Sequence, residues 1–180
     1  MIQRIQSFWL VLAMSCMVLC FIVPVAEYQL SMPSTGQKVE AEFNLVAKDN
    51  PDMWNQINNL DQMVVYSQQA SGFHTWPLIV LALASALVML VSIFLFKDRV
   101  LQMRVVAVGF LFNVAYVFLL FFWAVDAYGK TVVRMMQGAD LEVTWFVGAY
   151  APIVSLLFLV LAHRGIKKDE AKVRAADRLR

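Results

Sequence analysis

The sequence predicts an all-α membrane protein, a four-transmembrane-helix bundle with a small strand-plus-helix outer loop and a basic cytoplasmic C-terminal helix. Hydrophobic residues make up 61% of its 180 residues and charged residues only 16%, and charges are absent from four long stretches. A helix needs roughly 20 apolar residues to cross the hydrocarbon of a bilayer. The expected spans are therefore the four charge-free stretches, about 5–26, 75–96, 105–125 and 144–162. They divide the chain into a four-span domain, 1–165, and a basic tail, 166–180.

The basic residues predict the orientation of these spans. With both termini in the cytoplasm, 11 of the 15 Lys and Arg residues lie inside and four outside. Positive residues near span ends remain on the cytoplasmic side, so we expect a multi-pass protein with a cytoplasmic N-terminus and C-terminus. The basic residues expected inside are Arg4, Lys97, Arg99, Arg104 and the seven of the last stretch, 163–180.

The first apolar stretch has two interpretations. It is longer than the apolar region of about 7–15 residues in a signal peptide, and Pro24 disfavours cleavage at Ala26, so we favour a retained span. Cys16 and Cys20 lie one turn apart within it. We interpret them as small packing residues, because no His lies in any span to complete a metal site.

The outer loop, 27–74, is the one candidate for a folded part outside the spans. Apolar and polar residues alternate over Lys38–Leu45, which predicts a strand. Asn50-Pro51 then provides a helix start, and apolar residues recur at helical spacing to about Gln68. The apolar face of this helix either packs on the outer ends of the spans or binds an outer partner.

The third span places Asn113 near its midpoint, where its amide needs a hydrogen-bond partner. One interpretation pairs it with a Ser or a backbone carbonyl on another helix. The alternative makes Asn113 part of a polar pathway through the membrane. We favour the pairing, because a pathway normally includes ionisable side chains and the spans contain no Asp, Glu, Lys or His.

The last stretch, 163–180, has seven basic and three acidic residues, and the tail within it is expected to form a solvated helix. Glu170 with Arg174, and Asp169 with Lys172, have the spacing of ion pairs on one helix face. The tail serves as a positive-inside anchor, or it docks on anionic lipid or an acidic protein surface. Nucleic acid is not expected as a partner, because the tail has no aromatic residue on which bases could stack.

Three cytoplasmic segments resemble a known family. They are the start MIQRIQ, the turn FLFKDRVLQMR and the ending IKKDEAKVRAADRLR, and together they are similar to the uncharacterised four-span membrane proteins of Bacteroidota known as domain of unknown function 4293. The resemblance extends over the whole chain in its span layout. It implies the inner membrane of a Gram-negative cell, with a periplasmic outer loop, and it implies no catalytic residue or cofactor.

The sequence does not favour an enzyme, because no nucleophile lies beside a base and His74 and His163 are predicted at opposite membrane faces. We expect no cofactor and no metal. The function expected is that of a non-enzymatic accessory or scaffold subunit that engages a partner or anionic lipid through its cytoplasmic face. The alternative is a small permease or channel subunit acting as a homo-oligomer. The candidate interaction face is formed by Arg4, Lys97, Arg99, Arg104, Lys167, Lys168, Lys172, Arg174 and Arg178, and Asn113 is the candidate intramembrane polar contact.

Overall fold

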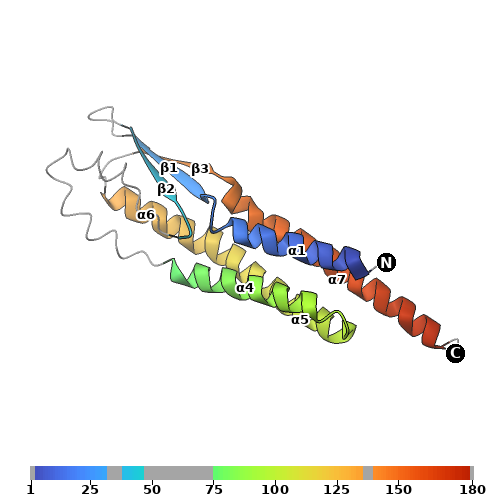
Figure 1. Cartoon of the computed structure of the whole chain (residues 1–180). Helices are drawn as coiled ribbons and strands as arrows, with labels where there is room; N and C mark the ends of the chain where they lie inside the picture. The colour runs from blue at the N-terminus through green and yellow to red at the C-terminus, as the bar shows by residue number, and fades with distance from the viewer. Residues whose placement is uncertain (1–2, 32–37, 47–74, 136–139, 179–180) are drawn as a thin grey trace. The chain divides into compact units, whose positions relative to one another are not determined.

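A computed structural model describes residues 3–31, 38–46, 75–135 and 140–178 (Figure 1). The chain divides into two compact units. The first is formed by Met1–Leu19, Val80–Val117 and Tyr150–Arg180, and the second by Cys20–Ile79 and Phe118–Ala149.

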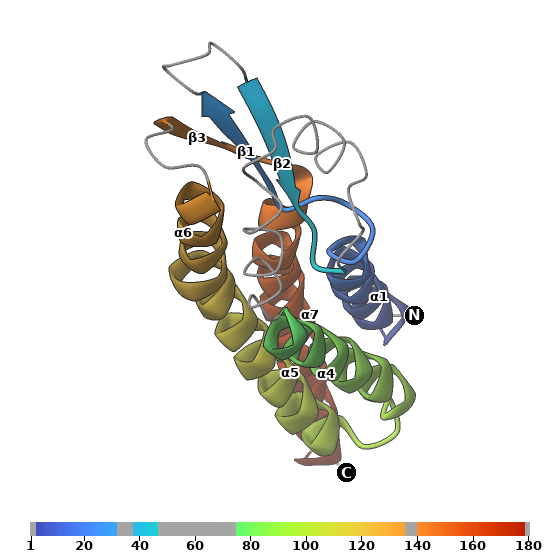
Figure 2. The same ribbon diagram turned by 90° about the vertical axis from the view of Figure 1, so that its left-hand side faces the viewer.

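The first unit is a set of helices that lie side by side (Figures 1 and 2). It contains α1 (Gln3–Leu19) and most of α4 (Trp76–Phe94), α5 (Arg99–Leu119) and α7 (Val147–Arg178). The short connection between α4 and α5 makes these two helices antiparallel neighbours, as the sequence predicts.

The buried residues of each helix recur at alternating intervals of three and four. This is the 3.5-residue repeat by which helices pack along a left-handed seam. The seam residues of the first unit are Gln6, Leu10, Ala13 and Met17 in α1, Ala82, Ser85, Met89 and Ser92 in α4, Gln102, Val106, Gly109, Asn113 and Tyr116 in α5, and Ser155, Leu159, Ala162, Ile166 and Asp169 in α7.

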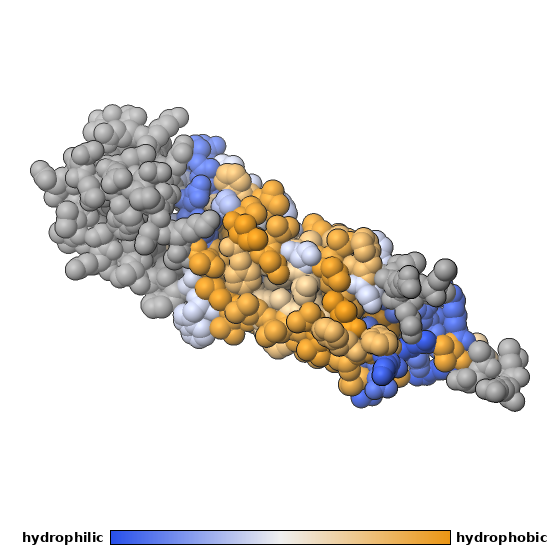
Figure 3. Space-filling model, in the orientation of Figure 1, coloured by the Kyte–Doolittle hydropathy of each residue, from blue (hydrophilic) through white to orange (hydrophobic). Residues whose placement is uncertain are grey.

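Polar side chains lie on this seam, whereas the outer surface is apolar. Large exposed side chains such as Leu87, Leu111 and Leu157 are each about 60% accessible, and hydrophobic residues cover much of the surface that is coloured in Figure 3. A soluble protein would have the opposite distribution. Among the described residues, three helices are long and apolar enough to cross a membrane, at Trp76–Phe94, Arg99–Lys130 and Val147–Ala175, and Gln6–Leu19 is a shorter apolar helix.

The second unit combines a three-stranded antiparallel sheet with a helix. Its strands have the order β2 (Lys38–Phe43), β1 (Ala26–Ser31), β3 (Asp140–Trp145). A π-helical turn, Leu120–Ala124, leads into α6 (Val125–Met135). The strand predicted from the alternation after Lys38 is confirmed as β2.

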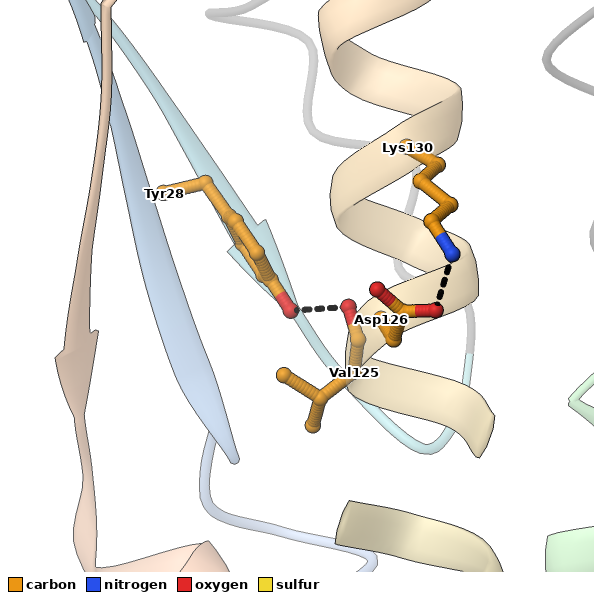
Figure 4. Close-up of polar contacts among 4 residues, drawn as sticks. All are labelled: Tyr28, Val125, Asp126 and Lys130. Atoms are coloured by element: carbon orange, nitrogen blue, oxygen red, sulfur yellow. Dashed lines mark hydrogen bonds and ion pairs between the residues drawn. The ribbon is translucent and has the colours of Figure 1, made fainter. Parts of the chain in front are cut away.

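A tyrosine attaches the sheet to α6. Tyr28 in the central strand is 1% exposed, and its hydroxyl donates to the carbonyl of Val125 at 2.9 Å (Figure 4). Its ring packs on that of Tyr128, which also contacts the Phe43 ring. Burial raises the pKa of the Tyr28 hydroxyl, and Tyr128 and Asp126 add to the rise, so this donor stays protonated at neutral pH. Asp126 itself pairs with Lys130 at 2.5 Å on the exposed face of α6.

The first predicted span, 5–26, is longer than the helix found there. α1 ends at Leu19, and Ala26 begins β1. The chain leaves the helix before Pro24, because the backbone of Val25 bonds to Phe43 and Phe146 instead of continuing a helical ladder. Apolar content alone does not distinguish a buried strand from a helix over such a short stretch.

The third and fourth spans also differ from the expected boundaries. The segment 126–143, between the third and fourth expected spans, contains most of α6 and the start of β3. The outer loop strand therefore belongs to a sheet whose third strand comes from a distant part of the chain. α7 continues without a break through Gly165 into the basic tail, where the fourth span was expected to close. The helix predicted from Asn50 to about Gln68 lies outside the described residues.

We predict that Gly148→Ala destabilises the protein. An added Cβ would lie 2.5 Å from the backbone oxygen of Pro24, which cannot rotate away. Overpacking of this kind costs about 1–3 kcal/mol, and the resulting loss should appear in the free energy of unfolding measured in detergent.

Gly109→Ala is the matched control. Its Cβ would lie 3.2 Å from the Cγ1 atom of the Val88 side chain, which can shift, and Ala gains about 1 kcal/mol over Gly in helix propensity. Equal losses of unfolding free energy for the two variants would show that the backbone oxygen of Pro24 does not restrict the side chain at position 148.

Candidate functional site

The predicted basic residues gather at one end of the first unit. This basic end consists of Lys97, Arg99, Arg104, Lys167, Lys168, Lys172 and Arg174. The connection that presents the first of them is short: the amide of Asp98 donates to Leu95, and the amide of Gln102 donates to Asp98, which starts α5 at Arg99. The α4–α5 connection and the C-terminal part of α7 lie at the same end of this unit (Figures 1 and 2). Arg4 lies in the first turn of α1, and Arg178 is the last residue of α7.

The first turns of the tail pack into the bundle and are not a free extension. Ile166 is fully buried, and Asp169 is only 7% exposed. The Gln6 side-chain amide donates to the carboxylate of Asp169, and the guanidinium of Arg99 donates to its backbone oxygen at 3.4 Å. At Gly165, a Cβ would lie 3.2 Å from the Cγ of Gln6, so glycine here permits α1 to approach α7 closely. Contacts from α1 and α5 thus hold the tail helix in a defined direction.

The outer face of this helix presents the charges. Lys167, Lys168, Lys172 and Arg174 are exposed. The predicted pair of Glu170 and Arg174 is confirmed, with a distance of 2.8 Å between the carboxylate and Nε. Asp169, expected to pair with Lys172, instead points inward to Gln6.

A shallow groove lies between the α4–α5 connection and the tail. Its walls combine apolar side chains with charges of both signs. Such a lining suits a peptide or a lipid that offers both apolar and polar groups, more than it suits a reacting substrate. The lining residues are Phe96, Lys97, Asp98, Arg99, Val100, Glu170 and Val173.

Asn113 lies in the interior of the bundle. Its side-chain amide donates to the Ser155 hydroxyl at 2.8 Å, and that hydroxyl donates to the carbonyl of Ala13 at 3.0 Å. Asn113 and Ser155 are both 0% exposed. Asn113 therefore has a serine partner on another helix, the kind of partner that the sequence suggested, and these bonds join α5, α7 and α1.

Gln6 and Gln102 are further buried polar residues, and their positions in the bundle were not identified from the sequence. Gln6 bonds to Asp169, and the Gln102 side chain donates to the backbone oxygen of Ser92 at 3.0 Å, joining α5 to α4. Ser85 is fully buried on α4. The sequence held a signal for the two glutamines, because each continues the alternating three- and four-residue spacing of the buried residues in its helix.

The described part of the chain has no group of three His, Cys, Asp or Glu residues that could hold a metal ion. Cys16 and Cys20 form no disulfide, and the Cys20 thiol lies 3.8 Å from the carbonyl oxygen of Gly148.

The helices that are long and apolar enough to cross a membrane, with their polar seam and basic end, define an α-helical membrane protein that also contains a small antiparallel sheet. The chain belongs to the family described as Domain of unknown function (DUF4293), whose model matches residues 2–179. This confirms the family that the sequence resembles. The chain matches none of the curated proteins compared with it.

We predict that Asp169→Ala loosens the tail from the bundle. The change leaves the buried Gln6 amide without its charged acceptor, which should lower the free energy of unfolding by about 1.5–3 kcal/mol. Hydrogen exchange of the amides of residues 163–173 should become faster.

Glu170→Ala removes the neighbouring carboxylate, which makes the exposed pair with Arg174, and should cost less than about 0.5 kcal/mol. If both variants have the same exchange rates as the parent protein, the contact between Gln6 and Asp169 does not hold the tail.

Proposed function

We propose that this protein is an integral inner-membrane protein with four spans and with both termini in the cytoplasm. In this proposed topology, α1 is the fourth membrane-crossing helix. Its 17 residues give a length of about 25 Å, and a bilayer adapts to a span a few ångströms short at modest cost. Its seam residues Gln6 and Ala13 bond to α7, so α1 shares the polar interior of the other helices. The positive-inside excess then places the basic end in the cytoplasm.

Its activity, in this proposal, is that of a non-enzymatic accessory or scaffold subunit whose basic end engages a partner complex or anionic lipid. The observation that best supports this is the packing of the tail: Ile166 and Asp169 fix one face of α7, so the lysines on the other face have a set position relative to Lys97 and Arg99. A fixed arrangement of charges costs less entropy on binding than a free tail would. A fixed arrangement of charges therefore suits recognition of one particular surface, on a partner complex or on anionic lipid.

A second candidate is a small permease or channel subunit that acts as a homo-oligomer. The buried bond between Asn113 and Ser155 favours it, because polar residues inside a bundle are also found along pathways. Full burial of both residues argues for the accessory role, since a pathway must admit its substrate. Asn113→Leu would impair a pathway much more than it would impair a scaffold.

We predict that Lys167→Gln, Lys168→Gln and Lys172→Gln together weaken binding at the basic end. Each lysine contributes about 1 kcal/mol beside an anionic surface, so the triple variant should bind about a hundredfold more weakly. The first measurement is purification of the full chain in mild detergent from its own host, with identification of what co-purifies. The second is binding to vesicles with and without anionic lipid.

Lys130→Gln is the control, because Lys130 lies in α6 and belongs to the second unit. A co-purifying protein that is lost with the triple variant indicates a partner complex, and a loss confined to anionic vesicles indicates lipid. Unchanged binding in both measurements would contradict the proposed role of the basic end.

We also predict the side on which single cysteines react. In a background with Cys16 and Cys20 replaced by Ala, Lys168→Cys should react with a membrane-impermeant maleimide only after the cytoplasmic side is opened. Glu142→Cys, in β3, should react in intact spheroplasts. The reverse pattern would exclude the proposed orientation, and reaction of both from one side would exclude the span count.

A further inference from the structure

The interior of the first unit contains a carbonyl group that needs a donor. The Oδ1 atom of Asn113 is fully buried, and no hydrogen bond from the described residues reaches it. Reversing the amide would not help, because the single Ser155 hydroxyl hydrogen is directed to Ala13 and could not serve Oδ1 as well. A buried acceptor of this kind costs about 1–3 kcal/mol when it is left unpaired.

Ser85 offers a donor from the neighbouring helix. Helical serines usually bond to the carbonyl four residues earlier, and two serines of this protein do so: Ser15 donates to Val11 and Ser92 to Val88, both at 2.9 Å. Ser85 makes no such bond, although it is 0% exposed. Its hydroxyl is therefore a second buried polar atom in need of a partner on the same seam.

The packing of α4 against α5 puts these two groups at the same level. A Cβ added at Gly109 would lie 3.2 Å from Val88, so these two residues face each other. The helices are antiparallel (Figures 1 and 2), and one turn onward along α5 is Asn113, while one turn back along α4 is Ser85. Both belong to the buried seams, so we expect their side chains to border one space between the two helices.

We propose that this space is a binding site for one water molecule. The water accepts a hydrogen bond from the Ser85 hydroxyl and donates one to the Asn113 carbonyl, which gives it the minimum of two polar partners that a buried water requires. Ser85 and Asn113 are both neutral, so the site favours a water molecule over a metal ion. The chain of hydrogen bonds then runs from Ser85 through the water, Asn113 and Ser155 to Ala13, and it ties together α4, α5, α7 and α1.

The test uses infrared difference spectroscopy of the full chain in lipid nanodiscs, comparing ordinary water with H₂¹⁸O. We expect an O–H stretching band that shifts to lower frequency on exchange, since the oxygen of water is replaced and the oxygens of the protein hydroxyls are not. Bulk water, which shifts as well, is removed by subtracting the spectrum of Ser85→Ala from that of the parent protein. The band should be lost in Ser85→Ala, and the side-chain carbonyl band of Asn113 should shift in the same variant. Ser92→Ala is the matched control and should retain both bands, because the Ser92 hydroxyl bonds within its own helix.

Thermal melting provides a second measurement. Ser85→Ala and Asn113→Leu should each lower the stability, and the double variant should lose less stability than the sum of the two single variants. The stability losses of Ser92→Ala and Asn113→Leu should simply add. If Asn113→Leu fails to fold, the spectra of Ser85→Ala decide alone, because removing one hydroxyl leaves the packing intact. Coupling without an isotope-sensitive band would indicate a direct bond between Ser85 and Asn113 and overturn the proposal. A band that persists in Ser85→Ala would overturn it as well.

Discussion

The hydroxyl of Ser155 accepts a bond from Asn113 and donates one to Ala13, and these bonds connect three helices at one level. They illustrate a constraint on the whole first unit. Its outer surface is as apolar as lipid, so the hydrophobic effect gives its helices little reason to associate once they are in a membrane. Close packing at small residues and hydrogen bonds between seam residues have to hold the helices together.

The same constraint explains the ends of the seam. Gln102 reaches the backbone of Ser92 beside the α4–α5 connection, and Gln6 reaches Asp169 in the tail. These longer side chains lie where the helices meet charged surroundings, whereas the small Ser and Asn side chains lie deeper. This difference between the ends and the middle of the seam follows from the free energy of burying polar groups. The hydrogen-bonding groups of a long amide or a carboxylate are easier to satisfy near water than in the middle of a bundle. The tail helix is thereby joined to the bundle by the same seam that assembles it.

Much of this arrangement could be predicted from the sequence. The features that could not be predicted have identifiable physical reasons. The charge-free stretches located α4, α5 and α7, and a midpoint Asn113 implied a polar partner. The end of α1 at Leu19 was not predictable, because residues 20–26 are as apolar as a helix would be. The backbone bonds of Val25 to Phe43 and Phe146, and the strand pairing that begins at Ala26, are not visible in composition. Asp169 was misassigned because an i,i+3 spacing suggests a surface pair, and only the tertiary position of Gln6 turns it inward.

The sheet has a consequence for how the protein is made. Its central strand, β1, pairs on one side with β2, which follows closely, and on the other with β3, which is synthesised more than 100 residues later. Until Trp145 leaves the ribosome, one edge of β1 has no strand to pair with, and the backbone bonds of Pro24 and Val25 to Gly148 and Phe146 cannot form. Such distant pairing is slow and leaves an edge open to other strands. Biogenesis of this protein should therefore depend on whatever shields that edge while α4 and α5 are inserted.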